Sequence, residues 1–226
     1  MIPEEERTLT EWQLHWLEAE GDLHPWRRQI IDEIDATRAA VSRLLPPPRL
    51  DVLIQRLPGM VIREIGMVGH AYRRSLFALT CDPDNENFAR CLSDGTLRRQ
   101  VAHEVHHCLR MGGPGYGRKL GEALVSEGLA GHFVRQLFSN PPEPWECALN
   151  RESLHAHFPE RTALDATDYD HAAWFFGSSG NRPRWTGYTL GYTLVEKWLE
   201  VTSGVGADAI VNVPANVVLA AWNGAK

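Results

Sequence analysis

Two amphipathic helices joined by a glycine-rich loop constrain this fold more than any other feature of the sequence. The first helix is expected to begin at Asp94 or Thr96, either of which can cap it, and to end near Arg110. Leucine and valine recur at every fourth position along it, which is the spacing of a buried helical face. The loop 112–117 contains four glycines, and the second helix is expected over about 118–138. The chain therefore returns antiparallel to the first helix.

The first of these helices carries the sequence His-Glu-Val-His-His, an HExxH motif that begins at His103. Residues four apart on a helix lie about 40° apart around the axis and roughly 6 Å apart along it. The imidazoles of His103 and His107 can therefore converge on one metal ion. Glu104 borders the same face and can reach a water molecule bound to that metal. This combination is the one that a zinc hydrolase requires.

A catalytic zinc with two histidine ligands needs a third protein ligand and one open position. The second helix supplies two candidate carboxylates, Glu122 and Glu127. Nineteen residues separate His107 from Glu127, enough for a helix end, the loop and about two turns of return. We favour Glu127 as the ligand, with Glu122 as the rival and more typical of a solvated or supporting position.

Two neighbouring residues are alternative ligands with weaker support. His106 lies three residues after His103, but only the pair four apart fits the motif, so His106 is interpreted as a surface or supporting histidine. Cys108 points about 100° away from His107 around the helix. It is interpreted as a packed core thiol.

The HExxH motif followed after nineteen residues by a helical glutamate resembles the gluzincins, the thermolysin-like zinc peptidases. The string Ser-Glu-Gly-Leu-Ala that contains Glu127 is similar to the Glu-Gly-Phe-Ala string of gluzincin aminopeptidases. More closely, the chain resembles a bacterial family of predicted zinc-dependent proteases of unknown function. That resemblance runs from the strand at Phe77 through both helices to the aromatic segments 174–177 and 183–192.

The resemblance implies further roles and shows one departure. A later helix of gluzincins brings a tyrosine or arginine that stabilises the developing oxyanion, a role that falls here to Tyr188, or else to Tyr192 or Arg184. Gluzincins also bind an extended peptide by strand addition, for which the strand Ser75–Cys81 is a candidate, although a plain core strand is equally consistent with its sequence. Thermolysin-like enzymes carry an aspartate four residues after the third ligand to orient a histidine, whereas this chain has Gly131.

The remaining segments predict an α+β protein. The expected fold is a mainly helical zincin-like domain with a small antiparallel sheet packed beside the HExxH helix. We expect one domain over 1–226, made of a helical segment 1–48, the sheet and active-site helices 49–140, and an irregular segment with C-terminal helices 141–226. The expected elements outside the site are helices at Thr8–Glu18, His24–Leu45, Thr186–Thr202 and Ala207–Trp222, strands at Leu50–Gln55 and Met60–Ile65, and an irregular excursion over 141–183.

Composition excludes several classes of function. The chain of 226 residues has a net charge of −6, which disfavours nucleic acid as the main partner. The acidic N-terminus does not resemble a secretion signal, and no apolar run is long enough to span a membrane. The four cysteines form no CxxC pair, as expected for reduced, mostly buried thiols in a cytoplasmic protein. A nucleotide site at the glycine loop and a serine nucleophile at Ser178-Ser179 have little support.

The sequence therefore predicts a zinc metallopeptidase with one catalytic ion. His103, His107 and Glu127 would hold the ion, Glu104 would act as general base and Tyr188 would stabilise the oxyanion. The expected partner is a peptide or protein substrate. The alternative is a zinc-binding regulatory or interaction module that retains the site without turning over peptides.

Overall fold

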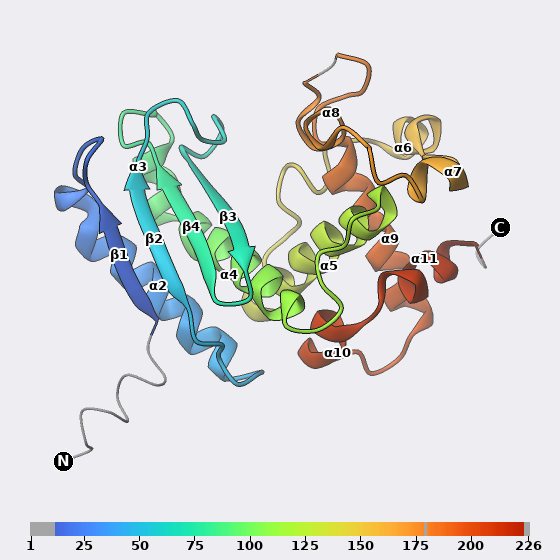
Figure 1. The fold of residues 1–226 in the computed structure, drawn as a ribbon, viewed down its shortest axis with the longest axis horizontal. Coiled ribbons are helices and arrows are strands. Elements are labelled where there is room, and N and C mark those ends of the chain that lie inside the picture. Colours follow the sequence, from blue (N-terminus) through green and yellow to red (C-terminus); the bar gives the residue numbers. More distant parts are fainter. Residues whose placement is uncertain (1–11, 179, 224–226) are drawn as a thin grey trace. The chain divides into compact units, whose positions relative to one another are not determined.

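The computed structural model describes residues 12–178 and 180–223. The chain forms two compact units that divide after Gly112, in the glycine-rich loop (Figure 1). The single domain expected over 1–226 stays a prediction. Between them they contain the helices and the small sheet of an α+β protein, as the sequence predicted.

The first unit contains a four-stranded mixed sheet in the order β1-β2-β4-β3. Its strands are β1 (Gln13–Leu17), β2 (Asp51–Arg56), β3 (Met67–Arg73) and β4 (Leu76–Cys81). Strands β1, β2 and β4 are parallel, and only β3 runs antiparallel to its neighbour β4. The expected antiparallel sheet is therefore wrong for most of the strands. A helix connects β1 to β2, and such a crossover returns the chain in the same direction.

Two of the expected elements in this unit differ from the structure. The described part of the predicted helix Thr8–Glu18 forms β1, in which exposed and half-buried residues alternate, and residues 8–11 lie outside the described residues. The predicted strand Met60–Ile65 is a turn that touches the sheet only through a bridge between Ile62 and Met67. The strand begins after this turn, as β3, which forms a hairpin with β4.

Helices cover one face of this sheet, as Figure 1 shows, with α2 and α4 lying behind the strands. The helical elements are η1 (His24–Trp26), α2 (Arg27–Ser42), α3 (Phe88–Ser93) and α4 (Thr96–Met111). Arg98 of α4 donates two hydrogen bonds, of 2.7 and 2.6 Å, to the carboxylate of Glu33 on α2. The Thr37 hydroxyl also donates to the Arg98 carbonyl at 3.0 Å. These bonds fix α4, which carries the HExxH motif, against α2.

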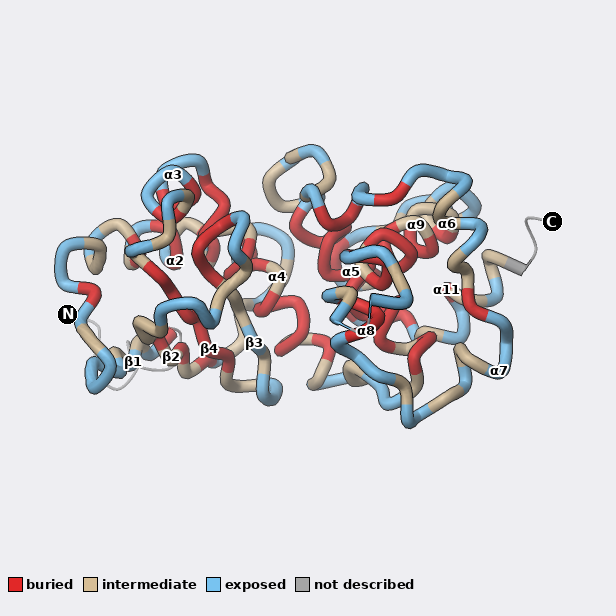
Figure 2. Tube along the Cα trace, turned by 90° about the horizontal axis from the view of Figure 1, so that it is seen from above, coloured by how far each residue is buried: buried red, intermediate tan, exposed pale blue. Residues whose placement is uncertain are grey.

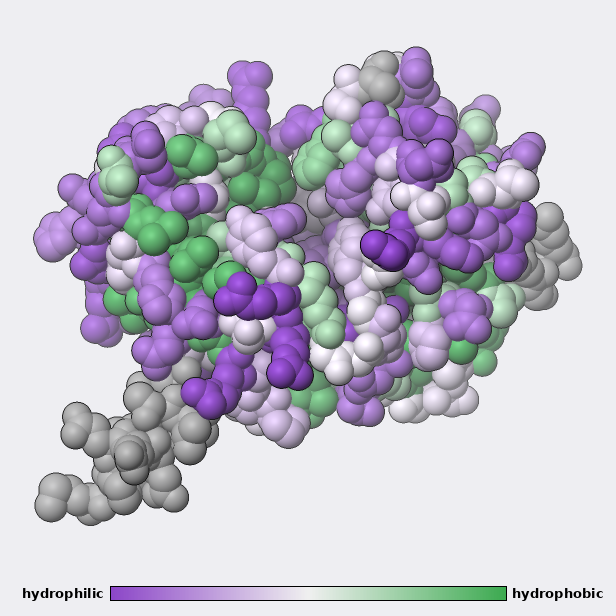
Figure 3. Space-filling view, in the orientation of Figure 1, coloured by the Kyte–Doolittle hydropathy of each residue, from purple (hydrophilic) through white to green (hydrophobic). Residues whose placement is uncertain are grey.

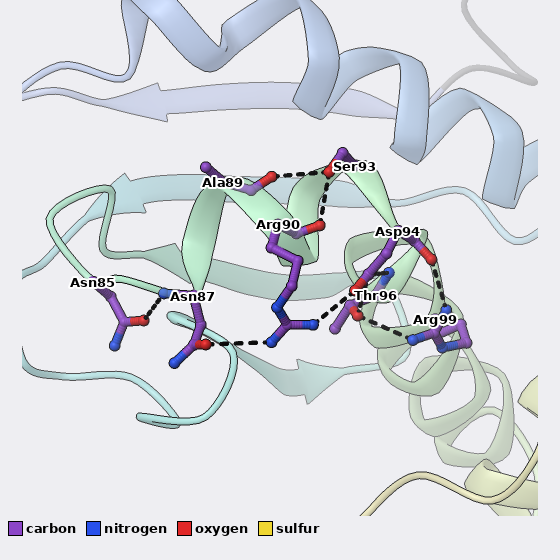
Figure 4. A network of polar contacts seen from close by, with 8 residues as sticks. All are labelled: Asn85, Asn87, Ala89, Arg90, Ser93, Asp94, Thr96 and Arg99. Carbon is purple, nitrogen blue, oxygen red and sulfur yellow. Dashed lines mark hydrogen bonds and ion pairs between the residues drawn. The ribbon is translucent and has the colours of Figure 1, made fainter.

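A polar network fixes the beginning of α4 (Figure 4). The Asp94 carboxylate accepts hydrogen bonds from the backbone amide and the hydroxyl of Thr96, at 3.0 and 2.5 Å. Arg90 of α3 donates to the same carboxylate at 2.9 Å, and Arg99 donates to the Asp94 carbonyl at 3.2 Å. The sequence predicted Asp94 or Thr96 as the cap, whereas the N-cap residue is Gly95, which has no side chain, and Thr96 is the first residue of the helix. Asp94 contributes from one residue earlier, through its hydrogen bonds with Thr96.

The second unit is built around two helices that touch backbone to backbone. Its helices are α5 (Leu120–Phe138), α6 (Arg151–His157), α7 (Arg161–Leu164), α8 (His171–Phe176), α9 (Thr186–Val201), α10 (Ala207–Asn212) and α11 (Ala215–Asn223). A Cβ atom at Gly128 of α5 would lie 2.0 Å from the Gly191 carbonyl oxygen of α9. Figure 2 shows that the buried residues of this unit concentrate on α5 and α9. The segment 141–183, expected to be irregular, contains three short helices.

Other expectations concern the surface and the cysteines. Figure 3 shows hydrophilic side chains over much of the visible face of each unit. Within the described part of the chain, none of the helices combines the length and the apolar character that a membrane span needs. All four cysteines are free thiols, and three of them are buried, in agreement with the prediction.

Candidate metal centre

The two motif histidines lie side by side on α4, one helical turn apart. Their ring centroids are 4.7 Å apart, with an angle of 82° between the ring planes. His107 is buried, so a metal ion held there would be partly shielded from water. The first turn of α4 is hydrogen-bonded to α2 through Arg98, and α4 also packs on strand β3. The two imidazoles therefore project from a helix that is held in place. The spacing argued from the sequence therefore produces the expected pair.

The Glu104 side chain projects from α4 and is buried against strand β3. A Cβ atom added at Gly69 of β3 would lie 2.3 Å from Cγ and 2.6 Å from Oε1 of Glu104. No real side chain tolerates such distances, so glycine at this position provides the space that the Glu104 carboxylate occupies. Gly69 was not predicted to be part of the site, because a glycine inside a strand indicates a close approach of another group but does not identify that group.

Glu127 lies on α5, in the second unit, and its carboxylate is buried. The hydroxyl of Tyr116, in the glycine-rich loop, donates a hydrogen bond of 2.7 Å to Glu127 Oε1. Burial and the neighbouring Glu127 carboxylate raise the pKa of Tyr116 well above its ordinary value, so this hydroxyl keeps its proton. Tyr116 was not predicted from the sequence, where it appeared only as one letter of a glycine-rich loop.

His103, His107 and Glu127 make up a candidate metal-binding group among the described residues. Two imidazole nitrogens and a carboxylate oxygen are the donors that catalytic zinc sites use, and they leave a fourth position for water or substrate. The chemistry of this donor set therefore fits zinc. The roles of the individual ligands stay predictions.

The rival carboxylate, Glu122, has a different set of partners. Its Oε2 atom accepts hydrogen bonds from the backbone amides of Arg118 and Lys119, at 2.7 and 2.9 Å. These amides lie at the beginning of α5, where helices leave donors without an intrahelical acceptor. Glu122 therefore caps α5, which accounts for this carboxylate without a metal.

The alternatives on α4 are both buried. Cys108 is fully enclosed, and burial raises its pKa to about 12, with Glu104 acting in the same direction. This environment is that of a core thiol, as predicted. His106 is also fully buried, so the surface alternative is wrong, and its role as a supporting histidine stays a prediction. The single apolar stripe did not predict this burial, because buried residues of α4 also lie outside that stripe.

The three candidates for the oxyanion donor differ in their surroundings. Tyr188 is half-buried among the rings of Phe175, Phe176 and Trp185. It also contributes to the raised pKa of Tyr116, so it lies within electrostatic range of the hydroxyl that contacts Glu127.

Tyr192 and Arg184 have other contacts. The Tyr192 ring stacks on His132, with centroids 3.9 Å apart, and its hydroxyl accepts a hydrogen bond of 3.4 Å from Arg135. Arg184 lies over the ring of Trp185, with 4.1 Å from its Cζ atom to the centroid. Tyr192 is thus part of the packing between α5 and α9, which favours Tyr188 among the three.

The departure at Gly131 has a structural reason. A Cβ atom at this position would lie 2.2 Å from Oε1 of Glu146, a buried residue from outside α5. The other oxygen of Glu146 accepts a hydrogen bond of 2.7 Å from the backbone amide of Glu143. A carboxylate therefore stands beside position 131, one turn after Glu127, although it comes from a different segment.

These features define a class of protein with a candidate HExxH metal centre on a helix and a carboxylate on the next helix. The chain belongs to the family described as predicted Zn-dependent proteases (DUF2268), whose model matches residues 31–220. It is also similar to the uncharacterized protein YjaZ of Bacillus subtilis (strain 168), with 27% identity over 136 residues. That match covers 57% of this chain and 51% of the relative, so the chain spans about half the length of the relative. No solved structure matches the chain.

Proposed function

We propose that this protein is a zinc-dependent peptidase in which His103, His107 and Glu127 hold one ion. The observation that carries the proposal is the pair of imidazoles on α4 together with the His-His-Glu donor set. The family name supports zinc-dependent proteolysis at the level of a class. When bound, zinc lowers the pKa of a water ligand to about 7 and polarises the scissile carbonyl.

Glu104 would act as the general base of this reaction. Its place in the motif borders the face of the two histidines, and its packing against Gly69 restricts the side chain to one region. It would take a proton from the attacking water and pass it to the leaving amine. Tyr188 would donate a hydrogen bond to the oxyanion that develops on the substrate.

We expect the substrate to pair with β3, which is an edge strand of the sheet. Of the two interpretations of Ser75–Cys81, the core strand is correct and the peptide-binding edge is wrong, because β4 lies between β2 and β3. The Gly66 carbonyl accepts a hydrogen bond from the backbone amide of Asp82, the residue after β4. The next carbonyl, that of Met67, points to the opposite side of β3, where it accepts a hydrogen bond from the backbone amide of Ile62. Backbone groups alternate along a strand, so the amide and carbonyl of Gly69 point away from β4. A peptide that pairs there by strand addition would lie beside Glu104.

Metal analysis and a digest of a proteome-derived peptide library test this proposal. The purified protein should contain one zinc per chain, and Glu104→Gln should keep the zinc and lose cleavage. Asp84→Asn changes an exposed carboxylate on the same unit and should leave both unchanged. Zinc retained with no cleavage by the wild-type protein would favour the alternative, a zinc-binding module without turnover. Absence of zinc from the protein would contradict both.

A further inference from the structure

We propose that Tyr116 is a positioning residue, which holds the Glu127 carboxylate in the orientation that a metal ligand needs. The inference rests on the proposed function, because it assigns Glu127 to the zinc. It starts from the hydrogen bond of 2.7 Å between the Tyr116 hydroxyl and Glu127 Oε1. This bond fixes the rotation of the carboxylate about its Cγ–Cδ bond.

Tyr116 can do this because α5 holds it at two points. Its hydroxyl binds Glu127, and its own carbonyl oxygen accepts a hydrogen bond of 2.8 Å from the hydroxyl of Ser126. Ser126 is fully buried and precedes Glu127 directly, so the tyrosine is held at both ends by adjacent residues of one helix. The two hydrogen bonds therefore hold the Tyr116 ring in a fixed position relative to the Glu127 carboxylate.

The glycines on either side of Tyr116 make this path possible. Gly115 and Gly117 have φ angles of +85° and +96°, which residues with a side chain rarely adopt. A Cβ atom at Gly117 would also lie 2.2 Å from Cβ of Glu122. The loop thus turns tightly onto the first turn of α5, where Glu122 caps the helix, and Tyr116 reaches back over it to Glu127.

The second ring of side chains around a metal sets the basicity and orientation of its ligands, and its loss typically costs 10- to 100-fold in metal affinity. Tyr116→Phe removes one hydroxyl and keeps the ring. We expect zinc affinity, measured by competition with a chromophoric chelator, to fall by about 10- to 100-fold. The visible spectrum of the cobalt-substituted protein should also change, because the carboxylate ligand becomes free to rotate.

Tyr169→Phe is the matched control. Burial and, after it, the Glu127 carboxylate raise the pKa of Tyr169, so this tyrosine lies near the ligand, and no hydrogen bond joins these two described residues. The control should keep the zinc affinity and cobalt spectrum of the wild-type protein. Ser126→Ala, which releases the other end of Tyr116, should weaken zinc binding by a smaller factor, and the melting temperature of each metal-free variant shows that it is folded.

The outcomes separate this inference from the proposed function. If Tyr116→Phe and Ser126→Ala both bind zinc and cobalt as the wild-type protein does, Tyr116 has no positioning role. If the wild-type protein binds zinc and cleaves no peptide, the peptidase proposal fails, and a weaker zinc affinity in Tyr116→Phe still supports the role of Tyr116.

Discussion

The Glu104 side chain on α4 lies in the space that any side chain at Gly69 of β3 would fill. Strand and helix thus meet at the residue proposed as the general base. The same glycine turns its backbone groups toward the open edge of the sheet. The packing of the proposed base and the proposed path of the substrate therefore both depend on this glycine.

Gly69→Ala should reduce peptide cleavage by at least 10-fold and leave the zinc content unchanged. The new methyl group forces Glu104 to move, and small displacements of a catalytic group cost about 10²-fold in rate. Steady-state kinetics and metal analysis of the same preparation check this. Gly206→Ala is the control, because a Cβ atom there meets nothing within 4 Å. Equal peptidase activity in Gly69→Ala and Gly206→Ala would show that cleavage does not require Glu104 to occupy the space beside Gly69.

Glu127→Gln should lose most of the bound zinc, whereas Glu122→Gln should keep it. The first change removes the charge of a proposed ligand. The second weakens the two hydrogen bonds that Glu122 accepts from backbone amides at the beginning of α5. Helix caps contribute about 0.5–2 kcal/mol to the free energy of unfolding, so Glu122→Gln should affect stability and not zinc. Metal content and urea unfolding of both variants measure the two effects. The opposite pattern of zinc loss would make Glu122 the ligand.

Tyr188→Phe should lower kcat by about 10²- to 10³-fold with zinc retained, the usual cost of removing an oxyanion donor. Tyr192→Phe removes a hydroxyl that only Arg135 is shown to contact, and should change kcat by less than a few-fold. Kinetics on one fluorogenic peptide compare the two. A larger loss in Tyr192→Phe would transfer the role to that residue.

Gly131→Asp should destabilise the protein, although an aspartate at this position would be expected from the thermolysin-like enzymes. The new side chain collides with Glu146, and overpacking of a buried site typically costs about 1–3 kcal/mol. Urea unfolding measures the loss. Adding Glu146→Ala removes the collision and should recover part of the stability. No recovery in the double variant would mean that Glu146 does not occupy this space in solution.

His132 should make the protein less stable in mild acid. Burial lowers its pKa from 6.5 to about 4, and its ring nitrogen Nε2 lies 3.0 Å from the Tyr192 carbonyl oxygen. Between these two pH values the unfolded chain binds a proton that the folded chain does not, so stability falls as the pH falls from 6.5 to 4. The loss is about 3 kcal/mol at most. Urea unfolding at several pH values should show a flatter dependence in His132→Gln.

The helices of the site were predictable from the sequence because local patterns determine them. The spacing of apolar residues gave α4 and α5 within a few residues, and the i, i+4 relation placed His103 beside His107. Both inferences use distances of one or two helical turns, which the sequence spacing fixes.

Only the tertiary structure decided the rest, because it depends on residues far apart in the chain. Strand β1 forms where a helix was expected because β2, more than thirty residues away, supplies its hydrogen-bond partner. The mixed sheet, the burial of His106, and the pairs Gly69–Glu104 and Gly131–Glu146 have the same origin. The sequence by itself determined the HExxH motif and the order of the helices that carry the proposed ligands. Packing decided which glycine accommodates Glu104 and which tyrosine donates a hydrogen bond to Glu127.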